Sequence, residues 1–128
     1  TQYRRYLIKT QDIDAYRSHL NTADNVVLVI QGDESVDHNG AFEGGDFAFL
    51  DTFRSISCVV CDIQVQNEPQ LMAKLNNLKK HSVIHLVIAA HGDPNNIYLA
   101  KEVVLSKGRL NTSPIMKKLK ELIALIFQ

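Results

Sequence analysis

The 128-residue sequence has little of what marks specialised classes of protein: no tryptophan, two cysteines, three prolines, and no net charge, because 14 basic residues balance 14 acidic ones. A balanced charge gives no electrostatic reason to expect a nucleic acid or an anionic membrane as a partner. No apolar run approaches the roughly 20 residues of a membrane span, and the first residues lack the pattern of a signal peptide. The 45% of hydrophobic residues and the length predict a single globular domain with a substantial core.

The two cysteines, Cys58 and Cys61, lie in one apolar run, Cys-Val-Val-Cys. In a strand, residues at this spacing point to opposite faces of the sheet, so the two thiols are not expected to bond each other. We interpret them as buried thiols in a reducing compartment, which predicts a cytoplasmic or other intracellular location. A zinc site is not expected, because there is no second Cys-x-x-Cys pair and the histidines lie in other predicted elements.

Apolar runs without alternation predict strands that are buried on both faces, as in parallel sheets. Such runs occupy residues 26–30, 58–65, 83–90 and 122–127. A short edge strand is expected at residues 6–9, and a hairpin at residues 96–99 and 102–106.

Helical spacing of apolar residues predicts helices between these strands. They are expected at residues 12–20, 46–53, 67–80 and 113–122. Asp46 and one of Asn111, Thr112 and Ser113 are candidate N-caps, and Pro69 and Pro114 suit first turns. The order of elements predicts an α/β fold, a three-layer sandwich whose mostly parallel sheet is covered by helices on both faces.

Functional residues of open α/β sheets gather at the carboxyl ends of the strands. The residues that follow the first and third apolar runs are Gly32, Asp33 and Glu34, and His91, Gly92 and Asp93. His38 lies in a glycine-rich loop that we expect to fold over the same edge. Asp33 and Glu34 can bind a cation or orient a base, or they form an acidic turn.

His91 is the most informative residue of this set, because a histidine at the end of an apolar strand is rigidly held and reaches solvent. Such a histidine can act as a general base or acid near neutral pH, and Gly92 leaves a backbone N–H accessible to an oxyanion. The alternative is a histidine that caps the strand end through a hydrogen bond. The residue pattern alone leaves both interpretations open.

The segment Ile-His-Leu-Val-Ile-Ala-Ala-His-Gly at residues 84–92 resembles the strand that ends in the catalytic His-Gly of clan CD cysteine peptidases. That family includes caspases, gingipains, separase and CHAT-type domains, and the resemblance extends in order over residues 26–128. It implies a caspase-like fold, with His91 as the catalytic histidine and the N–H of Gly92 in the oxyanion site. It also implies a peptide or protein substrate near Asp33, Glu34, His38 and Asp93, and no cofactor.

Two features depart from the family pattern. The nucleophilic cysteine is expected just after Gln128, whereas Cys58 and Cys61 belong to the second strand, so the chain as given cannot complete a cysteine–histidine dyad. We therefore expect residues 1–128 to be one domain, cut at its C-terminal end or processed there. The loop after the first strand also lacks an arginine for an acidic substrate side chain.

Two other functions remain open at this point. The chain can be an inactive caspase-like scaffold that pairs with a partner chain or a second copy through the edge of its last strand. It can also be an unrelated α/β hydrolase or phosphate-binding domain. No G-x-S-x-G, GxGxxG or Walker motif is present to support that last reading.

Overall fold

The computed structural model describes residues 5–32 and 58–125. Two short 3-10 helices, η1 (Thr10–Asp12) and η3 (Lys107–Arg109), accompany the strands and α-helices. In chain order these are β1 (Arg5–Lys9), α1 (Arg17–Leu20), β2 (Val26–Gln31), β3 (Cys58–Gln64), α2 (Glu68–Leu75), β4 (Val83–Ala89), β5 (His91–Asp93), β6 (Asn96–Ala100), β7 (Val103–Ser106) and α3 (Pro114–Leu122).

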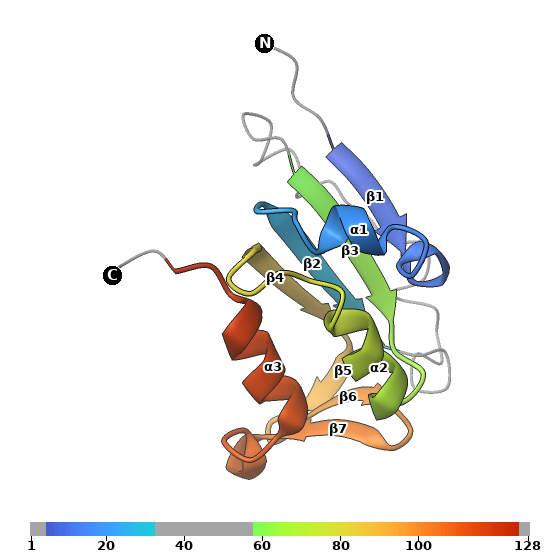
Figure 1. The fold of residues 1–128 in the computed structure, drawn as a ribbon. Helices are drawn as coiled ribbons and strands as arrows, with labels where there is room; N and C mark the ends of the chain where they lie inside the picture. The colour runs from blue at the N-terminus through green and yellow to red at the C-terminus, as the bar shows by residue number, and fades with distance from the viewer. Residues whose placement is uncertain (1–4, 33–57, 126–128) are drawn as a thin grey trace.

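A parallel sheet forms the centre of the fold, with the strand order β1-β3-β2-β4 (Figure 1). Strand β2 pairs with β3 on one side and with β4 on the other, and both pairings are parallel. Its five apolar residues are all buried, as expected for a strand that is covered on both faces. The predicted α/β class with a mostly parallel sheet is therefore confirmed.

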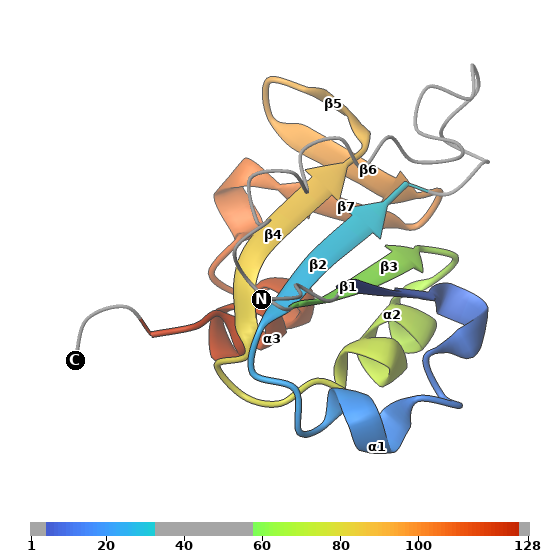
Figure 2. The ribbon, with the colours of Figure 1, turned by 90° about the horizontal axis from the view of Figure 1, so that it is seen from above.

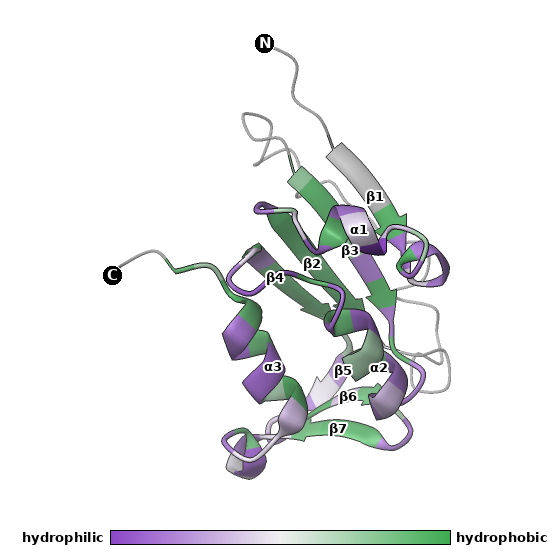
Figure 3. Ribbon diagram, viewed as in Figure 1, coloured by the Kyte–Doolittle hydropathy of each residue, from purple (hydrophilic) through white to green (hydrophobic). Residues whose placement is uncertain are grey.

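The described helices α1, α2 and α3 lie on the same face of this sheet (Figures 1 and 2). The larger core cluster joins Leu28 of the sheet to Leu75 of α2 and Leu119 of α3. Figure 3 shows β2 and β4 as apolar along most of their length, whereas α2 and α3 also carry polar residues. The helix expected at residues 46–53 lies outside the described residues, so the three-layer sandwich stays a prediction.

The two cysteines belong to separate core clusters on opposite faces of β3, as the sequence predicts. Cys61 packs in the larger cluster, and Cys58 packs in a smaller one with Val27 and Val60. Both are buried thiols that do not bond each other.

Both longer helices have a side-chain N-cap, and Ser113 is one of the three predicted candidates. The side chain of Asn67 accepts a hydrogen bond from the N–H of Gln70 (2.8 Å), and Ser113 Oγ accepts one from the N–H of Met116 (3.3 Å). A proline occupies the first turn of each helix. Two boundaries are wrong: α2 ends at Leu75 rather than at residue 80, and only residues 17–20 of the segment 12–20 are α-helical.

A small antiparallel sheet, in the order β5-β6-β7, follows β4. Strands β6 and β7 form the predicted hairpin, with register shifts between Tyr98 and Ala100. The sequence did not predict that residues 91–93 add a third strand to it. This sheet lies near the ends toward which β2, β3 and β4 point (Figure 1).

The strand predicted at residues 122–127 is not formed in the described part of this segment: Leu122 ends α3, and residues 124 and 125 belong to no strand. Within the described residues, Ile123 forms one parallel bridge with Val83, and the N–H of Ala124 donates to the carbonyl of Val83 (2.8 Å). His81 also holds this junction: its Nδ1 lies 3.0 Å from the carbonyl of Ile123, and its N–H donates to Glu121. No helix in residues 5–32 and 58–125 is long and apolar enough to cross a membrane.

Candidate functional site

The candidate site begins where β4 leaves the parallel sheet. After Ala89 the chain turns into the small sheet, and His91, which is half-buried, is the first residue of β5. The N–H of Gly32 donates to the carbonyl of Ala89 (2.9 Å), so the carboxyl ends of β2 and β4 lie side by side. The structure therefore brings Gly32 and His91 to one edge of the sheet, as the sequence predicts.

Gly92 occupies a position with no room for a side chain. It pairs with Ile97 across the β5–β6 ladder, and a Cβ at Gly92 would lie 2.8 Å from the carbonyl oxygen of Asn96. Real Cβ atoms essentially never come so close to another atom. The close approach of two backbones thus requires glycine here, independently of any role in catalysis.

One face of the small sheet carries His91 together with a set of polar residues. Side chains alternate between the two faces of a strand, so His91 and Asp93 share a face of β5. The register continues this face across β6 and β7: His91 pairs with Tyr98 and Tyr98 with Val104, while Asp93 pairs with Asn96 and Asn96 with Ser106. We call this set the His91 face.

Hydrogen bonds tie the polar members of the His91 face together. The carboxylate of Asp93 accepts from the hydroxyl of Tyr98 (2.5 Å), from the N–H of Asn95 (2.8 Å) and from Nδ2 of Asn96 (3.1 Å). Ser106 Oγ donates to Oδ1 of Asn96 (2.8 Å). The predicted substrate contact Asp93 therefore uses its carboxylate within its own hairpin.

The charges of the Tyr98–Asp93 pair are well defined. The hydrogen bond from Tyr98, followed by those from the amides of Asn95 and Asn96, lowers the pKa of Asp93. The same bond raises the pKa of Tyr98. Near neutral pH the pair is thus a charged acceptor and a protonated donor, which is the stronger kind of hydrogen bond.

Sequence reasoning missed Tyr98, Asn96 and Ser106 as neighbours of His91. Asn96 and Tyr98 alternate with apolar residues in the first segment predicted for the hairpin, and this alternation was the available signal. It did not reveal that His91 belongs to the same sheet. The other predicted contacts, Asp33, Glu34 and His38, lie outside the described residues.

The cysteines of the chain are not part of this site. Burial, followed by the charge of Asp62, raises the pKa of Cys61 to about 12, so this thiol stays protonated. Among the described residues, no group of three or more His, Cys, Asp and Glu side chains can hold a metal ion.

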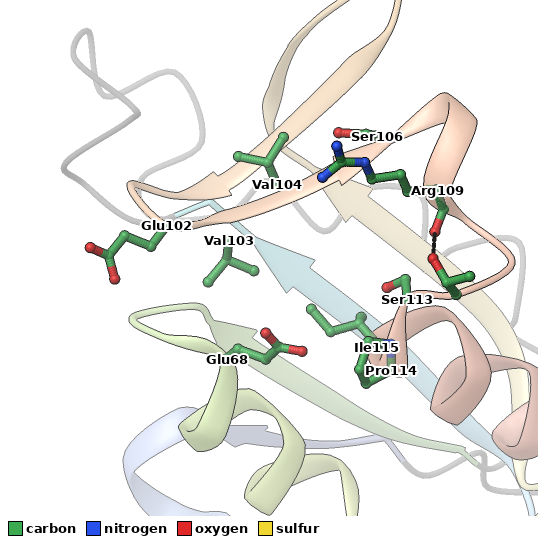
Figure 4. Close-up of a pocket in the computed structure, with 10 residues that line it drawn as sticks. Glu68, Glu102, Val103, Val104, Ser106, Arg109, Ser113, Pro114 and Ile115 are labelled. Carbon is green, nitrogen blue, oxygen red and sulfur yellow. Dashed lines mark hydrogen bonds between the residues drawn. The ribbon is translucent and has the colours of Figure 1, made fainter.

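An open cavity of about 330 Å³, lined in part by Val104 and Ser106, lies between β7 and the first turns of α2 and α3 (Figure 4). Glu68, Glu102 and Arg109 contribute charged groups to its lining. Figure 4 shows the carboxylate of Glu68 directed toward the first turn of α3. A second cavity of about 290 Å³ lies beneath the β5–β6 turn, next to Leu105 and Leu110, and His91 lines neither cavity.

Comparisons of the chain with models of protein families, with curated proteins and with solved structures give no match.

Proposed function

We propose that the chain is the histidine-bearing part of a clan CD-like cysteine peptidase domain that cleaves peptide bonds. His91 acts as the catalytic histidine, and the nucleophilic cysteine follows just after Gln128. The observation that carries the proposal is the parallel bridge between Val83 and Ile123, which lies at the start of the strand that leads to His91.

The bridge gives one paired position between β4 and the segment after α3. Parallel strands advance together, about 4.8 Å apart. If the pairing of Ile123 with Val83 continues, Gln128 comes level with Ile88, because each lies five residues further on. The next position then comes level with Ala89, the last residue of β4. We propose that a cysteine within three positions of Gln128 lies near His91, which follows β4 after one residue.

The reaction follows from that arrangement. His91 removes the proton of the thiol, and the thiolate attacks the carbonyl carbon of the substrate. The N–H of Gly92 donates to the oxyanion that forms. His91 then protonates the leaving amine, and a water molecule, activated by the same imidazole, hydrolyses the thioester.

The two cysteines and the polar residues after Gly32 bear on the nucleophile, the compartment and the substrate of the proposed peptidase. Neither Cys58 nor Cys61 is a suitable nucleophile, because both are buried in β3. Since both are thiols, we place the protein in a reducing, intracellular compartment. Asp33, Glu34 and His38 follow Gly32 in the sequence, and we assign them to substrate contacts. The charges of Asp33 and Glu34 disfavour an acidic side chain in the substrate.

The test uses the longer protein that includes the residues after Gln128, treated with a peptidyl electrophile. We expect the label on a cysteine within three positions of Gln128, as located by mass spectrometry. The His91→Ala variant should be labelled about 100-fold more slowly, in the range of general-base catalysis. His19→Ala is the matched control, because His19 lies on α1 and far from β5 in the sequence.

Two results contradict the proposal. One is the absence of a cysteine at those three positions in the full-length protein. The other is labelling of His91→Ala at the same rate as of His19→Ala, which removes the imidazole from the reaction.

A second candidate function is a binding module that uses the outer edge of β4. Ile123 and Leu125 are 42% and 55% exposed, and β4 is the last strand in the order of the described parallel sheet, with a bridge from Val83 to Ile123. A strand at the end of a sheet beside exposed apolar residues favours strand addition by a partner chain or a second copy. Sedimentation over a concentration series tests the second copy, and Leu125→Lys should abolish any concentration-dependent dimer.

A further inference from the structure

The cavity of about 330 Å³ follows the outer edge of β7, the last strand in the order of the described small sheet. Val103 is buried and Val104 is 38% exposed, as expected for neighbours that point to opposite faces of a strand. Both residues line the cavity. A cavity lined from both faces of a strand lies along its edge, so a ligand in this cavity meets the backbone of β7.

The backbone N–H groups of Val104 and Ser106 point toward this edge. In an antiparallel pair, residues whose backbone groups face the partner strand alternate with residues whose groups face away from it. The N–H of Lys107 faces the partner, because it donates to the carbonyl of Asn95, just before β6 (2.8 Å). By the register of β6 and β7, Leu105 faces β6 in the same way, whereas Val104 and Ser106 face away. An extended segment can pair with such an edge.

The charges around the cavity favour a basic side chain in that segment. Glu102 directly precedes β7, and Figure 4 shows the half-buried Glu68 across the cavity from β7. The ion pairs among the described residues join other carboxylates to lysine or arginine and include neither of these glutamates. The cation Arg109 lines the cavity beyond the other end of β7. The end of the cavity at which β7 begins is therefore acidic.

We propose that the edge of β7 is a docking site for an extended peptide segment: its backbone pairs with Val104 and Ser106, and its lysine or arginine side chain enters the cavity that Glu68 and Glu102 line. A metal ion is a poorer occupant, because no group of three or more ligating side chains occurs in the described part of the chain. The two carboxylates repel an anion.

The docking site adjoins the His91 face, to which Val104 and Ser106 belong. Adjacent strands lie about 4.8 Å apart, so β7 is about 10 Å from β5, which carries His91. A docked segment thus lies beside the face that carries the histidine. Docking itself does not depend on catalysis, and only the identification of the docked segment as part of a substrate rests on the peptidase function proposed above.

The backbone pairing is measured on the chain itself by amide hydrogen exchange. The probe is a blocked peptide of about seven alternating valine and threonine residues with one central lysine, because these residue types favour strands. We expect the peptide to slow exchange at Val104 and Ser106, and to change exchange less at Leu105, whose N–H faces β6. The same peptide N-methylated at every amide cannot donate to a strand edge and should give no protection.

The charge of the cavity is tested by replacing the central lysine with norleucine, which keeps the alkyl chain and removes the ammonium group. Glu68→Gln and Glu102→Gln should each weaken binding of the lysine peptide about 2–5-fold, as for partly exposed ion pairs. Neither substitution should change binding of the norleucine peptide. Glu121→Gln is the matched control, because Glu121 lies on α3 and pairs with Lys118.

Two results overturn the inference. One is unchanged exchange at Val104 and Ser106 with millimolar lysine peptide. The other is equal affinity of the parent for the lysine and norleucine peptides, which removes the basic side chain from recognition. In the longer protein, protection of these amides without any peptide cleavage refutes the proposed function and supports the docking site. Peptide cleavage without protection of these amides supports the proposed function and overturns the docking site.

Discussion

The close approach at Gly92 makes Gly92→Ala the most direct test of the geometry around His91. The added Cβ would lie 2.8 Å from the carbonyl oxygen of Asn96, whereas ordinary contact begins at 3.4 Å. The two backbones must therefore separate by about 0.6 Å, the difference between these distances. The obstacle is a backbone atom in the paired strand β6, so it cannot rotate away as a flexible side chain can.

The expected cost follows from comparable substitutions in packed positions. Inserting a methyl group into a space that must expand destabilises a protein by about 1–3 kcal/mol. For a domain of this size, each kcal/mol lowers the melting temperature by roughly 3–5 °C. We expect Gly92→Ala to unfold at a lower urea concentration and to shift the amide signals of the β5–β6 turn.

Two other glycines are matched controls for this substitution. A Cβ at Gly108 meets nothing within 4 Å, and one at Gly32 makes only ordinary contacts from 3.5 Å. Gly108→Ala should be neutral or stabilising by up to about 1 kcal/mol, because alanine reduces the entropy of the unfolded chain. Gly32→Ala should cost less than Gly92→Ala. If Gly92→Ala is as stable as Gly108→Ala, the backbone of Asn96 does not lie where the structure has it.

Three further predictions concern buried residues. Burial raises the pKa of Asp62, although a hydrogen bond from Gln31 acts in the opposite direction. The folded state therefore favours the protonated carboxyl. The contribution of Asp62 to stability is present below its ordinary pKa of 3.8 and is lost as the pH rises through the raised pKa. Asp62→Asn should remove this loss. In urea titrations from pH 3 to pH 7, the free energy of unfolding of the variant should therefore increase relative to that of the parent as the pH rises. Cys61 should react with a thiol reagent only when the chain opens, so its labelling rate should rise with urea, and fast labelling in native buffer contradicts its burial. Leu119→Ala should destabilise the domain by about 2–5 kcal/mol, because it leaves a cavity in the core. Leu125→Ala, at an exposed position, should change stability by less than about 0.5 kcal/mol. Equal effects of the two substitutions would contradict the core as described.

The starts of α2 and α3 and the strand β2 were predictable because their signals are local. Asn67 and Ser113 are cap residues just ahead of a proline, and the run at residues 26–30 is apolar at every position. The end of α2 was not predictable in this way. Leu78 is buried beyond the end of the helix, so its apolar character reports packing in a turn rather than another helical turn.

The candidate site was predictable only in part. The placement of His91 and Gly32 at one edge followed from the rule that parallel strands end together. The sequence did not predict that Tyr98, Asn96 and Ser106 lie on the same face as His91, because cross-strand register depends on which strand β5 pairs with. A one-residue slip would move their side chains to the opposite face.

The sequence by itself determined that the chain forms an α/β domain, that a histidine follows a buried strand, and that two buried cysteines point to opposite faces. These properties depend on residue type and on the two-residue period of a strand, which are both local. Only the tertiary structure decided that His91 opens a strand of a second sheet beside Tyr98, that Gly92 is required by the backbone of Asn96, and that Ile123 meets Val83. Each of these is a contact between separate segments, and the folded chain sets it through register and packing rather than through the residues on either side.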